Sequence, residues 1–113
     1  MTYKRLDKRL SKTVLDVVSK LAADYPRRRR LAECLVRKHT TDEQVEQLKQ
    51  VNAKIDKALE SVEEGIREYI LSDIASGNGY ERSMASCFVS RTAYYAKKNN
   101  AILEIARAFY LVV

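Results

Sequence analysis

The sequence has few residues that interrupt regular structure, with three glycines and one proline among 113 residues. A chain rich in β-strands needs more turn-forming residues than this, so the composition predicts a small all-α domain. Two cysteines and one histidine are too few for a zinc site with the usual four ligands, and no metal or cofactor is expected. No apolar run reaches the length of a membrane-spanning helix, so no membrane partner is expected.

Groups that carry catalysis are equally scarce. The chain has no histidine-centred pair, no glycine-rich phosphate loop and no cluster of metal ligands, which argues against an enzyme. Adjacent Glu63 and Glu64 are more simply explained as a solvated helix face. No signal peptide is apparent, so Cys34 and Cys87 are expected to be reduced, buried residues of a cytoplasmic protein.

The formal net charge of +6 is distributed unevenly along the chain. Basic residues outnumber acidic ones by twelve to four in residues 1–40 and by five to two in residues 76–113. In residues 41–75 the acidic residues outnumber the basic ones by nine to four. A polyanion is therefore expected to contact the two basic ends, and solvated helix faces with no anionic partner are the alternative.

Apolar residues at helical intervals predict a first helix over residues 6–23. It ends before Pro26, because proline disfavours helical backbone in the preceding residue and suits the first turn of a new helix. Asp24 or Tyr25 is expected to cap that second helix, which runs to about Lys38. Its predicted buried face consists of Leu31, Cys34 and Leu35.

Four consecutive arginines, residues 27–30, occupy the first turns of this second helix. Their charge opposes the positive end of the helix dipole, which favours an anionic contact there. Arg27, Arg28 and Arg30 are therefore candidates for phosphate contacts. A solvent-exposed polar face is the alternative, since four adjacent side chains cannot all point toward one surface.

A capping-box pattern in residues 40–44 opens a long central helix over residues 42–75. Its apolar residues alternate in steps of three and four, as in a short heptad seam, with Asn52 as a polar interruption. The seam packs either against the first two helices or against a second copy in a homodimer. Gly65 inside this helix indicates a bend or a close helix contact.

The sequence Ser-Gly-Asn-Gly at residues 76–79 is the clearest break in the chain and ends the long helix. A short helix over residues 80–88, a tight turn and a longer helix after Ser90 then form a helix-turn-helix. The chain is expected to divide into a helical N-terminal part, residues 1–76, and this helix-turn-helix unit, residues 77–113.

The helix after Ser90 changes character along its length. Ser90 suits the N-cap, because its hydroxyl can accept a hydrogen bond from a backbone N–H of the first turn. The first half is cationic and rich in hydrogen-bond donors, whereas the second half is apolar. The apolar stripe consists of Ile102, Ile105, Ala106 and Phe109. One half is thus expected to anchor in a core while the other contacts DNA, as a recognition helix does.

Specific roles follow for the side chains of the first half. Tyr94 is assigned to the core beneath the helix and Tyr95 to its surface. The side chains expected to face the major groove are those of Arg91, Thr92, Tyr95 and Asn99. The side chains expected to lie against flanking phosphates are those of Arg82, Lys97 and Lys98.

The run SRTAYYAKKNNAI at residues 90–102 resembles the C-terminal end of ArpU/RinA-type phage transcriptional regulators. The residues in matching places are Ser90, Tyr94, Tyr95, Lys97, Lys98 and Ala101. That family is similar to region 4 of sigma factors and controls late-gene transcription in phages of Gram-positive bacteria. The specific match covers about the last third of the chain. The resemblance implies double-stranded DNA as the partner in a bacterial host cytoplasm, with RNA polymerase or a homodimer contributing further contacts.

The main alternative is a non-catalytic helical interaction module, such as a phage structural, adaptor or inhibitor protein. Such a module would use the long helix as a coiled coil or a partner groove. An exposed cationic edge after Ser90 favours DNA binding, whereas burial of Tyr94, Tyr95 and the Lys97 stem favours the interaction module. RNA binding is a third hypothesis, and nothing in the sequence requires it.

Overall fold

The computed structural model describes residues 10–38, 42–77, 79–82 and 89–112. Every regular element within these residues is helical, which confirms the all-α prediction. The elements are, in chain order, α1 (Lys12–Ala23), α2 (Tyr25–Arg37), α3 (Asp42–Ala58), the 3-10 turn η2 (Leu59–Ser61), α4 (Glu64–Ser76), the 3-10 turn η3 (Tyr80–Arg82) and α5 (Arg91–Ala108). Across the described ranges, no helix is long and apolar enough to cross a membrane.

The first two helices lie close to their predicted positions. α1 begins at Lys12 rather than residue 6, because the Ser11 hydroxyl accepts a hydrogen bond from the Val14 amide at 3.2 Å and caps the helix there. Residues 6–9 lie outside the described part of the chain. Only Asp24 separates α1 from α2, so the proline junction turns the chain without a loop.

The predicted helix over residues 42–75 is interrupted between α3 and α4. The chain passes through η2, and Val62 adopts an extended backbone (φ −100°, ψ 141°) before α4 begins. The Arg67 guanidinium stabilises this break by donating to the Val62 carbonyl at 2.7 Å and to the Glu60 carbonyl at 3.3 Å. A Cβ at Gly65 would meet no neighbouring element within 4 Å, so no close helix contact requires this glycine, which is the second residue of α4.

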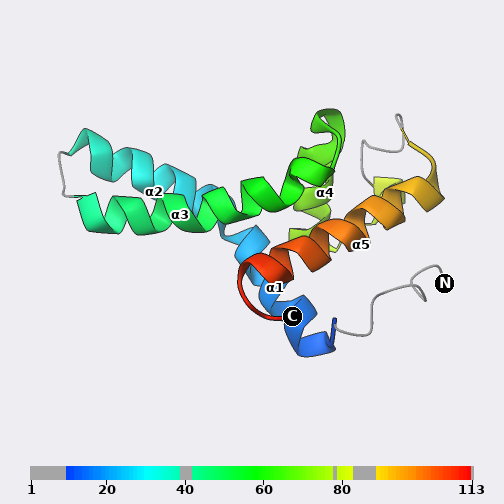
Figure 1. Cartoon of the computed structure of the whole chain (residues 1–113). Coiled ribbons are helices and arrows are strands. Elements are labelled where there is room, and N and C mark those ends of the chain that lie inside the picture. The colour runs from blue at the N-terminus through cyan, green and yellow to red at the C-terminus, as the bar shows by residue number, and fades with distance from the viewer. Residues whose placement is uncertain (1–9, 39–41, 78, 83–88, 113) are drawn as a thin grey trace.

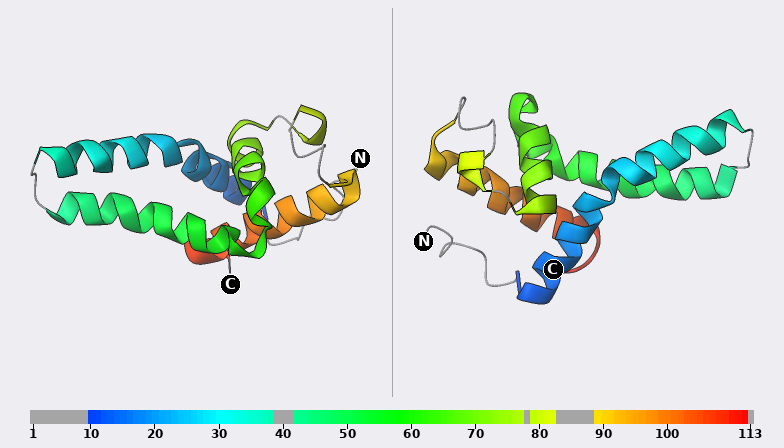
Figure 2. Two further views of the ribbon diagram at one scale, coloured as in Figure 1. Left: turned by 90° about the horizontal axis from the view of Figure 1, so that it is seen from above. Right: turned by 180° about the vertical axis from the view of Figure 1, so that it is seen from behind.

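α2 and α3 form an antiparallel hairpin that projects from the other helices (Figure 1). Views from above and from behind show the same projection (Figure 2), and the chain measures 49 × 32 × 20 Å along its principal axes. We call this hairpin the arm. α1 packs on α4 and α5, and α5 also crosses the base of α3. The seam of α3 is therefore used for packing within the chain.

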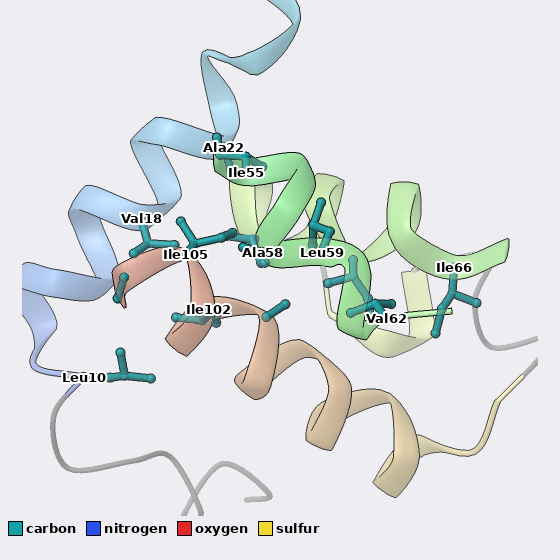
Figure 3. Close-up of a cluster of buried hydrophobic side chains, with 14 of the residues drawn as sticks. Leu10, Val18, Ala22, Ile55, Ala58, Leu59, Val62, Ile66, Ile102 and Ile105 are labelled. Carbon is teal, nitrogen blue, oxygen red and sulfur yellow. The ribbon is translucent and has the colours of Figure 1, made fainter. Parts of the chain in front are cut away.

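A single apolar core joins α1, α4 and α5 to the base of α3 (Figure 3). Its large, fully buried side chains include Val18 of α1, Ile55 of α3, Ile70 of α4, and Tyr94 and Ile105 of α5. Burial of Ile102, Ile105 and Ala106 confirms that the second half of the last helix anchors in a core. Because the core takes residues from both predicted parts, 1–76 and 77–113, α5 is held by the same packing as α1 and α4.

α2 buries a different face from the predicted one. Arg28 and Ala32 are its buried residues. Leu31 is 37% exposed, and Cys34 and Leu35 are only half-buried, so the prediction of a buried face at these three positions is wrong. The reason is that α2 packs mainly on α3, and a helix with one packing partner covers only one stripe.

The predicted break after α4 is present. Gly77 adopts the left-handed conformation (φ 75°) and its amide donates to the Asp73 carbonyl at 2.6 Å, which ends the helix. Of the predicted helix over residues 80–88, the structure describes a single 3-10 turn, η3. Residues 83–88, which include Cys87, lie outside the described residues, as does Asn78.

Candidate nucleic-acid interface

α5 begins as the sequence predicts. The Ser90 hydroxyl accepts a hydrogen bond from the Ala93 amide at 3.2 Å, and the Ser90 backbone is extended (φ −71°, ψ 161°). The Ser90 carbonyl accepts the first helical hydrogen bond, from the Tyr94 amide at 2.9 Å. A fixed first residue sets the direction of every side chain in the next two turns.

Both tyrosines of the pair are buried. Tyr94 is 0% exposed and lies in the core as predicted, but Tyr95 is 6% exposed, so the prediction of a surface position is wrong. Tyr80 of η3 is the reason, since its ring centroid lies 5.3 Å from that of Tyr94 and 6.5 Å from that of Tyr95. The Tyr95 hydroxyl accepts a hydrogen bond from the Tyr80 amide at 3.1 Å. Tyr95 therefore holds η3 against α5 and does not reach outward to a base edge.

A buried carboxylate of α4 lies beneath the first half of α5. Asp73 is 2% exposed and accepts hydrogen bonds from the Tyr94 hydroxyl at 2.5 Å and the Gly79 amide at 2.9 Å. Lys98 Nζ lies 3.1 Å from Asp73 Oδ1, and only 16% of the Lys98 side chain is exposed. Since a buried carboxylate needs a counter-charge, Lys98 serves Asp73 and does not fit its predicted contact with phosphate.

Two further basic residues of α5 pair with carboxylates at the surface. Lys97 Nζ lies 2.9 Å from Glu63 Oε1, with 28% of the lysine side chain and 65% of the glutamate side chain exposed. The Arg91 guanidinium pairs with Glu81, and both of these side chains are well exposed. Exposed ion pairs contribute only about 0–1 kcal/mol, so a phosphate can replace the carboxylate in either pair. The predicted cationic edge is thus partly neutralised within the chain.

The accessible face of this half of α5 carries uncharged polar side chains and one arginine. Arg91, Thr92 and Ala96 are exposed, Asn99 is half-buried and Asn100 is exposed. Asn100 donates to the Ser61 hydroxyl at 3.2 Å. No acidic residue occurs between Ser90 and Leu103. Three of the four predicted groove-facing residues therefore remain accessible.

Arg82 is exposed in η3 at the entrance to the segment that precedes α5. Its predicted contact with a phosphate flanking the recognition helix depends on the turn in residues 83–88. That turn lies outside the described residues, so the relation of Arg82 to α5 stays a prediction.

The arginines of α2 divide into buried and exposed members. Arg28 is 6% exposed, and its guanidinium donates to Asn52 Oδ1 at 2.7 Å, to the Leu21 carbonyl at 2.5 Å and to Asp24 Oδ2 at 3.2 Å. A buried guanidinium with these partners does not fit the predicted phosphate contact of Arg28. Arg30 is exposed and forms no ion pair with the described residues.

A polar network at the base of the arm fixes its direction. Arg27 is exposed and binds Asp24 through both carboxylate oxygens, at 2.6 and 2.9 Å, which lowers the pKa of that carboxyl. Asn52 donates to the Tyr25 carbonyl at 3.1 Å. Burial, followed by the hydrogen bond to Asp56, raises the pKa of Tyr25 to about 12. The predicted polar interruption of the seam is thus the residue that holds α2 against α3.

Asp73 was not among the candidate residues, although the sequence contains a signal for it. It lies three residues after Ile70 and one before Ile74, so it falls on the apolar stripe of α4. A carboxylate on such a stripe indicates a buried, paired acid. Its partners Tyr94 and Lys98 could not be assigned without knowledge of how α4 and α5 pack.

Comparisons with known proteins give no relative for this chain: no family model, no curated protein and no solved structure matches it. Within the described part of the chain, no group of three or more His, Cys, Asp or Glu residues could hold a metal ion. Cys34 is a free thiol.

Proposed function

We propose that this protein binds double-stranded DNA as a transcriptional regulator, with the first half of α5 in the major groove. The observation that carries the proposal is the contrast between the two halves of α5. The second half is buried among α1, α3 and α4, while the first half presents an accessible face without acidic residues. A recognition helix needs both properties: one end packed in the protein core, and an accessible face with hydrogen-bond donors for base edges.

The side chains on that face match the chemistry of base edges. Arg91 suits the two acceptors of guanine, and Asn99 suits the donor–acceptor pair of adenine. Thr92 and Ala96 can contact a thymine methyl group. From Thr92 to Asn99 a helix advances by about 10 Å, or about three base pairs. This is the footprint of one recognition helix.

The proposal uses fewer residues than the sequence predicts. Burial of Tyr94 and Tyr95 and the half-buried stem of Lys97 favour the interaction module at these three positions. Tyr95 and Lys98 are therefore not part of the proposed interface. Lys97 remains in it only as a surface charge that can exchange Glu63 for a DNA phosphate. Arg91, Thr92 and Asn99 keep their proposed roles, and Asn100 is added because it is exposed on the same side.

The resemblance to ArpU/RinA-type regulators supports the same proposal and adds its biological setting, which is late-gene control in a phage. A single small unit binds DNA weakly, so a homodimer on two half-sites or a contact with RNA polymerase would supply the remaining affinity. The proposal requires neither a cofactor nor a catalytic step.

A gel-shift series with the genomic DNA around the protein's own gene tests the proposal. We expect saturable binding whose log K falls with log salt at a slope of roughly −4 to −5, for about five phosphate contacts. Arg91→Ala should lower the affinity for the preferred site about tenfold or more and relax sequence preference. Arg107→Ala is the matched control, because Arg107 is an exposed, ion-paired arginine in the last turn of the same helix.

Two results would reject the proposal. One is the absence of saturable, sequence-selective binding in any of the flanking DNA. The other is an Arg91→Ala variant whose binding equals that of Arg107→Ala. Either result leaves the non-catalytic interaction module as the better hypothesis.

A further inference from the structure

The chain leaves α5 through a backbone conformation that suits glycine better than the residue present. Tyr110 has φ 60°, and among the described residues it is the one non-glycine residue with a positive φ. Its amide donates to the Arg107 carbonyl at 3.1 Å, and the Leu111 amide donates to the Ala106 carbonyl at 2.8 Å. This pair of hydrogen bonds ends a helix with one residue in the left-handed region, usually a glycine. α4 places Gly77 in that region, whereas α5 places a tyrosine there at a cost in backbone strain.

The strained tyrosine points to solvent. Tyr110 is 86% exposed, whereas its neighbours Phe109, Leu111 and Val112 are partly buried against the core. These three neighbours anchor the end of the described chain, so the tyrosine ring contributes little to packing. Glycine would make the same turn without strain, so the fold does not require a tyrosine at this position. Backbone strain that the fold does not require indicates that the side chain has a function.

A lysine of α3 lies beside this tyrosine. Lys54 Nζ lies 5.5 Å from the centroid of the Tyr110 ring and 5.3 Å from that of Phe109. Lys54 is exposed and forms no ion pair with the described residues. The residues three and four positions away on α3 are uncharged or basic, namely Gln50, Val51, Lys57 and Ala58. Glu104, the one acidic residue of α5, pairs with Arg107 at 3.3 Å. A hydroxyl donor thus lies next to an ammonium that no described carboxylate neutralises.

This site lies within reach of a duplex bound to the first half of α5. α5 and the base of α3 lie along one edge of the molecule, and the C-terminal end of the chain lies at the same edge (Figure 2, left). From Ala96 to Ala108, where α5 ends, the helix advances by about 18 Å, or about five base pairs. In long recognition helices the C-terminal end contacts the DNA backbone. A duplex that holds the first half of α5 in its major groove therefore brings a backbone strand past the end of the helix.

We propose that Tyr110 and Lys54 bind a backbone phosphate of the same DNA, through the tyrosine hydroxyl and the lysine ammonium. Both side-chain types donate to phosphate oxygens in protein–DNA complexes, and such contacts fix the position of the protein without reading sequence. The inference rests on the proposed function and adds a sequence-independent contact at the far end of the same helix. A protein partner fits less well. With Phe109, Leu111 and Val112 packed on the core, one exposed ring is a small anchor for a protein interface.

Gel shifts with the preferred site and with an unrelated duplex, each over a salt series, test this contact. We expect Tyr110→Gly and Lys54→Ala to lower the affinity for both duplexes about three- to tenfold, because a phosphate contact carries no sequence information. Lys54→Ala should also reduce the salt slope by about one. Tyr110→Phe keeps the ring but loses the hydroxyl donor, and should bind about threefold more weakly.

Lys49→Ala is the matched control for the lysine. Lys49 is an exposed lysine of the same helix, but it lines the groove between α2 and α3. Its removal should leave both the affinity and the salt slope unchanged. Arg91→Ala provides the opposite contrast, since it should weaken binding mainly at the preferred site.

Thermal unfolding of Tyr110→Gly gives a second measurement, independent of DNA. Because glycine relieves the strain at this turn, we expect the Tm to rise by about 2–5 °C. Higher stability together with weaker DNA binding would identify a side chain that serves binding rather than folding. A lower Tm would assign Tyr110 to the fold and overturn the inference.

Two binding results would also overturn it. In the first, Tyr110→Gly and Lys54→Ala bind DNA as Lys49→Ala does while Arg91→Ala is defective, so the proposed DNA binding stands without this phosphate contact. In the second, Tyr110→Gly abolishes a concentration-dependent dimer seen by sedimentation and leaves DNA affinity unchanged, which makes the ring a contact between two copies. A wild-type protein that binds neither duplex would reject the proposed function and this inference together.

Discussion

α2 and α5 are both basic helices, but their basic side chains differ in the partners that they find in the folded chain. Lys97, Lys98 and Arg91 of α5 each lie against a carboxylate from another element. In α2, Arg27 and Arg28 bind Asp24 at the start of the same helix, whereas Arg30 and Arg37 are exposed and form no ion pair with the described residues. The two helices differ in what surrounds them more than in their own composition.

This difference follows from where each helix packs. α5 lies against α4 and the chain around it, which belong to the acidic middle of the sequence, so carboxylates meet its lysines as the fold forms. α2 packs mainly on α3, which is also acidic, but Asn52 accepts from Arg28 and Asp56 accepts from the Tyr25 hydroxyl, so no ion pair joins α2 to α3 among the described residues. A positive stretch in a sequence therefore indicates where charge is available only after the neighbouring elements are known.

The strongest test of this comparison removes the buried carboxylate beneath α5. Asp73→Ala leaves the Tyr94 hydroxyl and the Lys98 ammonium without their acceptor in a buried site. We expect the free energy of unfolding to fall by about 3 kcal/mol or more, because an uncompensated buried charge remains. Denaturant titration measures this change. Glu64→Ala, at an exposed position of the same helix, is the control and should have little effect.

A second test compares two arginines within α2. Arg28→Ala removes the donors to Asn52 and to the Leu21 carbonyl, and should cost about 2 kcal/mol. Arg30→Ala should stay within about 0.5 kcal/mol of the parent, because that side chain is exposed and unpaired. Thermal and denaturant unfolding of the two variants should give the same ranking. Equal effects would mean that the base of the arm is not held by the Arg28–Asn52 hydrogen bond.

The smallest expected effect concerns the exposed ion pair of α5. Lys97→Met removes the partner of Glu63, an exposed carboxylate, and should change the free energy of unfolding by less than about 1 kcal/mol. Lys98→Met, one residue further, should cost more because Asp73 is buried. Unfolding measured at low and high salt distinguishes the Lys97–Glu63 pair from the Lys98–Asp73 pair. Salt screens the exposed Lys97–Glu63 pair more strongly, so the effect of Lys97→Met should shrink more at high salt. A larger effect at Lys97 than at Lys98 would reverse the assignment of the two lysines.

Local signals in the sequence predicted several features of the candidate interface correctly. Ser90 caps α5 and Gly77 ends α4, because a short hydroxyl side chain and a residue without Cβ favour those positions in almost any fold. Burial of Ile102, Ile105 and Ala106 followed from their helical spacing.

Features that depend on a distant partner were predicted wrongly or not at all. Tyr95 was assigned to the surface because adjacent residues on a helix point in different directions, but Tyr80, fifteen residues earlier, covers it. The break between α3 and α4 has no proline, and the Arg67 side chain that stabilises it acts only when the chain has already turned. The unburied stripe of α2 looked like a core face, because spacing alone does not show whether a second partner exists.

The order of amino acids alone determined that this chain is helical, where its last helix starts, and which half of that helix is apolar. Those properties arise from interactions within a few residues of the backbone. Tertiary packing decided which charges remain available: it placed Asp73 under Lys98 and left Arg37 exposed, without an ion pair to the described residues. Charge neutralisation and burial depend on contacts between segments far apart in the chain, and these exist only once the helices have packed.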